Sequence, residues 1–376
     1  MQRKQEHTLL NTIPLGLLMT LALMGTYTIP FVIGAVVEGM GWDPSRASAL
    51  GTTEILGIAA GGIASSLLFN LEKGFGKAAG SALLIGAVAQ FLSAHAQDYP
   101  TLLILRSLAG LSQGVLIAVV NTLVARTTQP ERVYGLVFTT SSSCFALLLF
   151  ALQYGEHTGL FYSLSVIFTL GLALVGKLHT PPQGAAEGEH SNPSKVFWPL
   201  LLYFFCILSI VYVILGGTWA FTERVAVRID IDRKTIGVLL GFSTLAGVAG
   251  AASAARVGSS WGYSRPLVLA YIASGVTVLS ITLATSVTLY AAGIILYGYL
   301  YMFAISFALG ITAHLDRTGR IAARTNSFIL IPYSFGPLLF GIVGLDNLAV
   351  LGGWCFIACV GAAMLSSDFI RRLDLA

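Results

Sequence analysis

The sequence predicts an all-α membrane protein in which twelve transmembrane helices form two pseudo-symmetric six-helix bundles. Charged residues make up only 10% of the chain, against about 25% in an ordinary soluble domain, and the mean hydropathy is +0.81. Apolar runs of about 20 residues recur along the chain, which is the length of a helix that crosses the hydrocarbon core of a bilayer. One long polar connection falls after the sixth run and divides the runs into two equal sets.

Each apolar run is long enough for a helix, and none shows the alternation over about ten residues that marks an outer-membrane strand. The first run is too long for the core of a signal peptide and lacks a small-residue cleavage site, so we expect it to be retained. Pro30 lies within this run and can kink its helix. The predicted spans are residues 12–36, 48–70, 78–96, 100–125, 133–154, 158–176, 197–221, 235–256, 266–285, 287–313, 323–343 and 348–369.

The positive charges predict the orientation in the membrane. An even number of spans puts both termini on one side, and 15 of the 21 Lys and Arg residues fall on that side. By the positive-inside rule, both termini are cytoplasmic and the protein is a multi-pass protein of the cytoplasmic (inner) membrane. The formal net charge of +4 therefore bears on topology, and we expect contact with the lipid bilayer but no nucleic-acid partner.

The predicted domains follow from the polar connection, which is rich in proline, glycine and charge. Residues 1–176 form an N-terminal six-helix bundle, residues 177–196 a cytoplasmic linker, and residues 197–376 a C-terminal six-helix bundle.

The two predicted bundles repeat one another weakly. Parallel six-span repeats joined by a cytoplasmic loop are the plan of one class of transporters. Three pairs of segments share nearly constant offsets of 190, 186 and 188 residues: LGIA at 56–59 with AGVA at 246–249, Gly76 with Gly262, and RTTQPER at 126–132 with HLDRTGR at 314–320.

The stretch RSLAGLSQG, residues 106–114, is similar to the fourth-span motif of the major facilitator superfamily, an arginine followed by spaced glycines. Span count, central loop and inter-span turns extend the resemblance over the whole chain. It implies the fold of that superfamily and transport by alternating access, with gating at the turns of Gly76 and Gly262. Three features depart from the pattern. The turn between spans 2 and 3 reads FNLEKGFGKAAG and keeps little of the family's G-x-L-a-D-R-x-G-R-R, the turn RVGSSWGYSRP has no acid, and the glycine-proline motif of the similar drug/proton antiporters is absent from span 5.

Arg106 is the only charge inside the fourth predicted span, where an arginine costs a few kcal/mol and usually faces the bundle interior. We expect it to hold an anionic substrate or to be released from an acid by protonation. The alternative is a structural arginine bonded to carbonyl oxygens at a helix break. Helical spacing places it on one stripe with two amides and with glycines that allow close helix approach: Arg106, Gly110, Gln113, Gly114, Ile117 and Asn121.

Glu54 is the best acid for Arg106, because it is the only carboxylate well inside a predicted span of the first half. Burial disfavours a charged carboxylate and a nearby arginine favours it, so a carboxylate subject to both can exchange a proton. The repeat counterpart, near Thr244, is not acidic. The alternative is a solvated glutamate bonded to Thr52 and Thr53. Helical spacing places Glu54 on one face with small residues, so we expect it to point at protein and not at lipid; the face consists of Glu54, Gly57, Gly61 and Ser65.

Other polar residues complete the predicted site. Glu223 and Arg224, at the end of span 7, are expected to form a gate in the outer loop or an interfacial anchor. The predicted substrate-binding residues are Arg106, Gln113, Asn121, Tyr27, Thr28, Ser142, Tyr212, Trp219, Tyr297, Asn326 and Tyr333. Hydroxyl groups in membrane helices more often bond to their own helix, which is the alternative for each of them.

No motif for hydrolysis, ATP binding or nucleophilic catalysis stands out, so we predict a transporter and not an enzyme. The four cysteines match no metal or redox spacing, and we expect neither a metal nor a cofactor.

We predict a monomer that moves a small organic solute, anionic if Arg106 binds it, in exchange or symport with protons. Three alternatives remain: a drug or metabolite efflux antiporter of the same fold, a facilitator without coupling, and a non-transporting membrane sensor or assembly partner.

Overall fold

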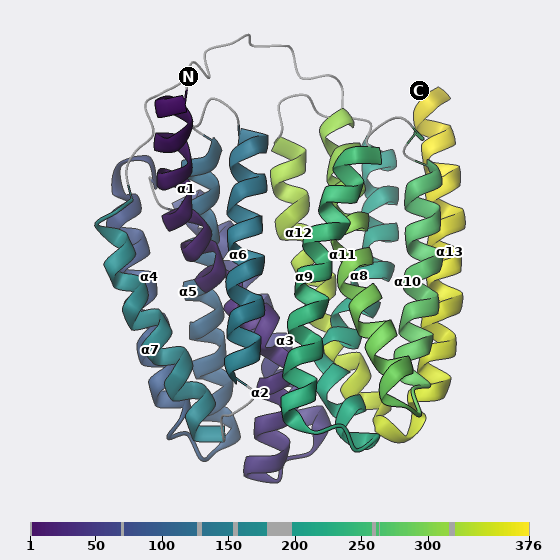
Figure 1. Ribbon diagram of the computed structural model, residues 1–376, viewed down its shortest axis with the longest axis horizontal. Coiled ribbons are helices and arrows are strands. Elements are labelled where there is room, and N and C mark those ends of the chain that lie inside the picture. The colour runs from purple at the N-terminus through teal and green to yellow at the C-terminus, as the bar shows by residue number, and fades with distance from the viewer. Residues whose placement is uncertain are drawn as a thin grey trace. The chain divides into compact units, whose positions relative to one another are not determined.

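The computed structural model describes residues 2–68, 71–125, 130–152, 157–178, 198–257, 261–262, 264–315 and 320–375 (Figure 1). Helices lie at all twelve predicted spans, with two helices at the first. The helices are α1 (Gln2–Ala22), α2 (Met24–Met40), α3 (Pro44–Leu68), α4 (Leu71–Ser93), α5 (Tyr99–Ala125), α6 (Pro130–Leu152), α7 (His157–Val175), α8 (Trp198–Arg228), α9 (Arg233–Val257), α10 (Ser264–Thr282), α11 (Val287–Leu315), α12 (Arg320–Val343), the 3-10 turn η1 (Leu345–Asn347) and α13 (Leu348–Leu375).

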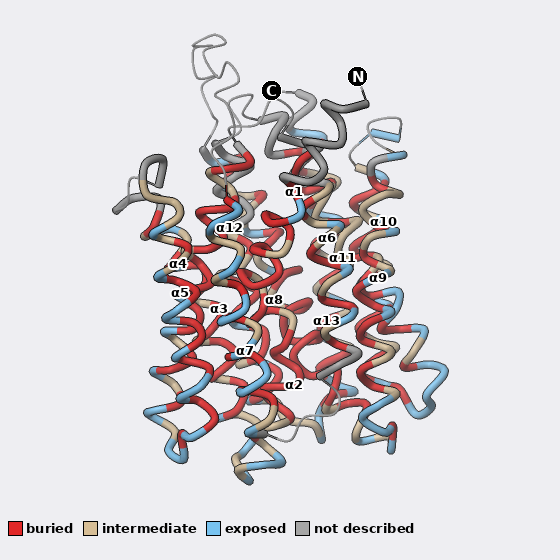
Figure 2. The backbone as a smooth tube through the Cα atoms, turned by 60° about the vertical axis from the view of Figure 1, so that its left-hand side comes forward, coloured by how far each residue is buried: buried red, intermediate tan, exposed pale blue. Residues whose placement is uncertain are grey.

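Within the described residues, ten helical segments are long and apolar enough to cross a membrane, with α1 and α2 counted together as Thr12–Met40. The apolar stretches of α6 and α12 are shorter, Leu136–Leu149 and Phe328–Val343. Buried and exposed residues alternate along the helices, which is the pattern of helices that each bury one face (Figure 2).

The chain divides into two compact units. The first comprises residues 1–43 and 50–190, and the second comprises residues 44–49 and 191–376. In the first unit α4 packs on both α5 and α7, and α1 packs on α6; in the second, α9 packs on α11, α8 on α12 and α10 on α13. Most of the predicted linker, from residue 179 on, lies outside the described residues.

The first predicted span is two helices and not one. The helix is interrupted at Leu23, whose φ and ψ are −103° and 7°, seven residues before Pro30. Pro30 itself lies inside α2, so the expected kink is displaced toward the N-terminus. The backbone N–H of Gly25, in the first turn of α2, has no partner within the helix. It donates to the side chain of Gln113 on α5, which replaces the hydrogen bond lost at the break.

Short polar side chains fix the starts of three helices outside the membrane spans. The backbone N–H of Thr101 donates to Asp98 at 2.9 Å before α5, and the N–H of Leu289 donates to Ser286 at 3.3 Å at the start of α11. Asp232 accepts bonds from both the hydroxyl and the N–H of Thr235, at 2.6 and 3.0 Å, before α9. These bonds favour the carboxylate and lower the pKa of Asp98 and of Asp232.

Helices α9 and α11 of the second unit cross at glycines. A Cβ on Gly298 would overlap the carbonyl oxygen of Ser243, and one on Gly250 would overlap that of Tyr299. Only glycine permits these two backbones to approach so closely.

We expect Gly298→Ala to lower the free energy of unfolding by about 1–3 kcal/mol, because the new methyl group meets backbone and not a movable side chain. The measurement is SDS-induced unfolding in mixed micelles. Gly353→Ala in α13 is the matched control, since no atom lies within 4 Å of the added Cβ. Alanine there should keep or raise stability, by up to about 1 kcal/mol. Equal losses in the two variants would contradict the close crossing.

Candidate functional site

Helices α3 and α5 of the first unit cross as closely as α9 and α11 do in the second. A Cβ on Gly110 would overlap the carbonyl oxygen of Glu54, and a Cβ on Gly114 would overlap that of Ile58. From the other side, a Cβ on Gly61 would overlap the carbonyl oxygen of Leu111. The close approach brings a side chain of α3 against the side chains that α5 projects one helical turn away.

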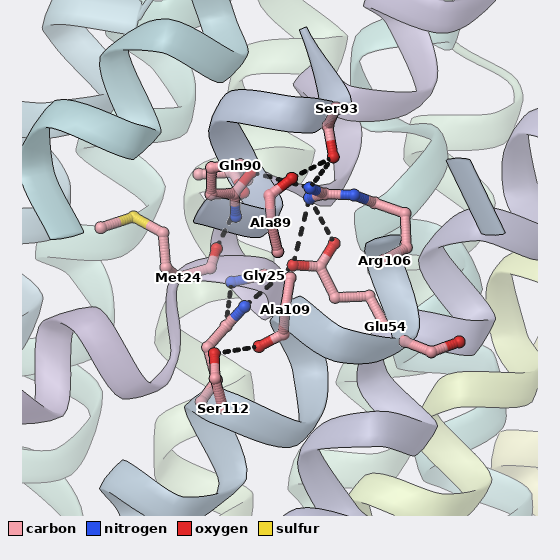
Figure 3. A network of polar contacts seen from close by, with 12 residues as sticks. Met24, Gly25, Glu54, Ala89, Gln90, Ser93, Arg106, Ala109 and Ser112 are labelled. Atoms are coloured by element: carbon pink, nitrogen blue, oxygen red, sulfur yellow. Dashed lines mark hydrogen bonds and ion pairs between the residues drawn. The ribbon is translucent and has the colours of Figure 1, made fainter. Parts of the chain in front are cut away.

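At this crossing the structure brings Glu54 and Arg106 together as a buried ion pair (Figure 3). Nη1 of Arg106 lies 3.3 Å from Oε2 and 3.5 Å from Oε1 of Glu54. The exposed fraction of Arg106 is 0% and that of Glu54 is 2%. A charge so far from solvent is costly unless hydrogen-bonding partners compensate for the lost water; among the described residues both Nη atoms of Arg106 find partners and Nε does not.

The other end of the guanidinium group contacts two further helices. Nη2 of Arg106 donates to Oε1 of Gln90 at 2.9 Å and to Oγ of Ser93 at 2.6 Å, both on α4. The ring centroid of Phe161, on α7, lies 4.7 Å from Cζ of Arg106, within the range of a cation–π contact. One arginine thus joins three helices to α5.

The carboxylate of Glu54 has a third neighbour, Gln113. Nε2 of Gln113 donates to Oε1 of Glu54 at 2.9 Å, and Oε1 of Gln113 accepts the N–H of Gly25 at 2.6 Å. A Cβ on Gly25 would lie 2.6 Å from Oε1 of Glu54, so a larger residue there would displace the carboxylate. The site is therefore a chain of contacts from Arg106 through Glu54 and Gln113 to the break between α1 and α2 (Figure 3).

Among the described residues, the corresponding crossing of the second unit has a serine hydroxyl and a backbone carbonyl where the first unit has the ion pair. Ser243 lies 189 residues after Glu54, and its Oγ donates to the carbonyl oxygen of Ile294 at 2.6 Å. Ile294 lies 188 residues after Arg106. The repeat counterpart of Glu54 is thus Ser243 and not Thr244, whose hydroxyl bonds to its own helix at Leu240. The ionisable pair belongs to one half of the repeat.

Aromatic side chains gather in the second unit. The centroids of Tyr212 and Tyr301 are 5.9 Å apart, those of Trp219 and Tyr297 also 5.9 Å, and those of Tyr301 and Tyr333 6.2 Å. We call these five residues the aromatic cluster. Four of them are predicted substrate-binding residues, and the structure brings those four together around Tyr301.

Two hydroxyl groups of the aromatic cluster differ in their bonding. Tyr297 donates to the carbonyl oxygen of Leu215 at 2.8 Å. The hydroxyl of Tyr212 is buried and has no hydrogen-bond partner within the described residues. It is therefore available to a polar group that enters the cluster.

The predicted site residues of the first unit outside the ion pair lie in separate contacts. Tyr27 stacks on Phe145 with centroids 3.9 Å apart and is joined to Ser142 by a side-chain hydrogen bond. The hydroxyl of Thr28 donates to the carbonyl oxygen of Met24 at 2.9 Å, so it bonds to its own helix, as hydroxyl groups in membrane helices often do. Asn121 is half-buried on α5. The side chain of Asn326 lies outside the described residues.

The predicted gate residues are placed differently from expectation. Helix α8 continues to Arg228, so Glu223 and Arg224 lie inside a helix and not in an outer loop, and Glu223 is 5% exposed. The predicted span stops too early because it ends where charged residues begin, whereas the helix keeps them. Gly262 has φ +68°, a conformation suited to glycine, and Gly76 lies within the first turns of α4.

Sequence reasoning missed Gln90, Ser93 and Phe161, and among the tyrosines of the tenth span it selected Tyr297 and not Tyr301. Gln90 and Ser93 are polar, three residues apart and inside an apolar span, so they share a helix face and could have been recognised as partners of a buried charge. Nothing in the sequence sets Phe161 or Tyr301 apart from the other aromatic residues of the chain.

The sequence model described as Major Facilitator Superfamily matches residues 15–341. The chain belongs to the Major Facilitator Superfamily. It is therefore a multi-pass membrane transporter and not an enzyme, and the predicted fold and family resemblance are confirmed.

Several solved transporter structures resemble this chain over nearly its whole length. The nucleoside transporter NupG has a TM-score of 0.74 at 11% identity, covering 97% of this chain and 98% of its own. The D-xylose-proton symporter has 0.70 at 13%, covering 96% and 97%. The human organic anion transporter MFSD10 has 0.66 at 15%, covering 97% and 99%. A comparison with curated protein sequences found no match.

The ion pair should behave as a unit in stability measurements. We expect Arg106→Met to lower the free energy of unfolding by about 3–5 kcal/mol, because it leaves Glu54 charged and buried without its partner. The double variant Glu54→Gln with Arg106→Met should lose less than Arg106→Met alone. SDS-induced unfolding of the wild type, the single variants and the double variant gives the coupling energy. Strictly additive losses would mean that the two groups do not interact.

Proposed function

We propose that this transporter moves a small organic solute across the cytoplasmic membrane by alternating access, coupled to protons through Glu54. The observation that carries the proposal is the buried contact between one carboxylate and one guanidinium group in the first unit. A proton on Glu54 would leave the positive charge of Arg106 without its counter-ion, in a place where charge is costly. The site then favours either an anionic group of the solute or a rearrangement of the helices.

Arg106 supports an anionic solute as the first choice. Its Nη1 faces Glu54, and when Glu54 is neutral a carboxylate or phosphate of the solute would supply the missing negative charge. The similar structures are described as transporters of nucleosides, organic anions and D-xylose, so they provide probes of three chemistries.

The aromatic cluster of the second unit supports a solute with a ring. Four tyrosines and one tryptophan offer apolar faces, and the hydroxyl of Tyr212 offers one hydrogen bond. Tyr27, Thr28, Ser142, Gln113, Asn121 and Asn326 are proposed as further contacts to the solute.

We also propose Glu223, Arg224, Gly76 and Gly262 as gate residues, a monomeric state, and an orientation with both termini in the cytoplasm.

Transport in proteoliposomes tests the proton assignment. A thermal-shift screen with nucleosides, organic anions and sugars first selects a solute, since a ligand of the folded state raises apparent stability. We expect Glu54→Gln to abolish accumulation driven by an imposed pH gradient, because glutamine carries no exchangeable carboxyl proton. Exchange of labelled for unlabelled solute across the same vesicles should continue.

The exchange measurement in this test is the control for folding and insertion. If Glu54→Gln accumulates solute under the pH gradient as the wild type does, the proton assignment is wrong. Wild-type flux that only equilibrates the solute would identify an uncoupled facilitator.

Tyr212→Phe tests the aromatic cluster. We expect a rise of about 3- to 10-fold in KM for a solute with a polar ring substituent, which corresponds to one hydrogen bond, at unchanged stability. Tyr162→Phe is the control, because Tyr162 is an exposed tyrosine of α7 in the first unit, with its hydroxyl 3.0 Å from Nε2 of His95. Equal KM changes in both variants would argue against solute binding at the cluster.

A further inference from the structure

The break between α1 and α2 leaves a backbone donor that the helices themselves do not satisfy. Gly25 lies in the first turn of α2, where N–H groups have no partner within the helix. Its N–H donates to Oε1 of Gln113 at 2.6 Å, 88 residues along the chain. The break is therefore held by one side chain of α5.

The orientation of the Gln113 amide follows from its two partners. The N–H of Gly25 can only donate, so the amide oxygen must face it, and the NH₂ group must face the carboxylate of Glu54. An ionised Glu54, which can only accept, suits this arrangement. Both bonds form together only while Glu54 offers an acceptor at this oxygen.

A proton on Glu54 changes what its neighbours must supply. Two described side chains hydrogen-bond to the carboxyl group, and they are Arg106 and Gln113 of α5. Arg106 is the charged group that faces it and has no acceptor atom. Its other partners, Gln90 and Ser93 of α4 and Phe161 of α7, are uncharged.

A proton on Oε2 of Glu54 would face only Arg106, which has no acceptor, whereas a proton on Oε1 can be accepted by the amide oxygen of Gln113. The amide would have to turn over, which places its NH₂ group against the N–H of Gly25, donor against donor. The two bonds of Gln113 then compete.

We propose that Gln113 is a positioning residue that couples the protonation of Glu54 to the backbone break between α1 and α2. With Glu54 ionised, Gln113 holds the N–H of Gly25; with Glu54 protonated, it releases the N–H and frees the start of α2 to move. The inference rests on the proposed proton exchange at Glu54 and adds the step by which that proton changes the conformation of the first span.

The chain allows this bond to be observed directly. Met24-Gly25 and Met40-Gly41 are the two Met-Gly pairs of the sequence. Purified full-length protein labelled with carbonyl-¹³C methionine and ¹⁵N glycine therefore gives two amide signals in a carbonyl-selective NMR spectrum. Gly41, exposed at the end of α2 with φ +66°, is the internal reference. The amide proton shift of Gly25 reports whether its hydrogen bond is intact.

We expect the Gly25 signal of the wild type to move upfield as pH falls, while Gly41 stays in place. Glu54→Gln should lose this titration, because it has no carboxyl group to protonate. Gln113→Leu should give an upfield Gly25 signal at every pH, since leucine offers no acceptor. Ser112→Ala is the matched control on the same helix: its hydroxyl bonds locally to Ala109, so the titration should match the wild type.

Two results would overturn the inference. One is a Gly25 signal that titrates in Gln113→Leu as in the wild type. The other is a wild-type signal that does not respond to pH. If the same preparation still accumulates solute under a pH gradient through Glu54, the proposed function stands and only the role of Gln113 is wrong. Gln113→Asn, which keeps the amide on a shorter side chain, replaces Gln113→Leu if that variant does not fold.

Discussion

The guanidinium group of Arg106 carries a full charge at a position without solvent exposure, and such a charge persists only where partners surround it. Three helices of the first unit supply them to the arginine of α5: α3 with Glu54, α4 with Gln90 and Ser93, and α7 with Phe161. Each partner fixes the position of its helix. The same contacts that compensate the charge of Arg106 therefore also position α3, α4 and α7 against α5.

Close helix crossings make the pair possible and also explain the repeat. Both units use glycine to bring two backbones together, at Gly110 in the first and Gly298 in the second. The second unit fills the equivalent positions with a serine hydroxyl and a backbone carbonyl. The same scaffold therefore holds an ionisable pair in one half and a neutral contact in the other, and the second half contributes aromatic rings instead.

The break in the first span links this electrostatic site to the backbone. A helix interrupted inside a membrane must satisfy its freed N–H groups, since no water is available to do so. Here a side chain that already bonds to the buried carboxylate also binds the freed N–H of Gly25. The amide group of Gln113 therefore contacts both the charge of Glu54 and the start of α2.

The sequence by itself determined the class, the spans and the choice of Glu54 as partner of Arg106. Low charge and runs of membrane length leave few alternatives, and two opposite charges on glycine-lined helix faces have few ways to be satisfied. The break at Leu23, the extension of α8 past Glu223, and the partners Phe161 and Tyr301 were decided by the tertiary structure alone. Each depends on a contact between residues far apart in the chain, such as the bond from Gly25 to Gln113, and composition and periodicity describe one segment at a time.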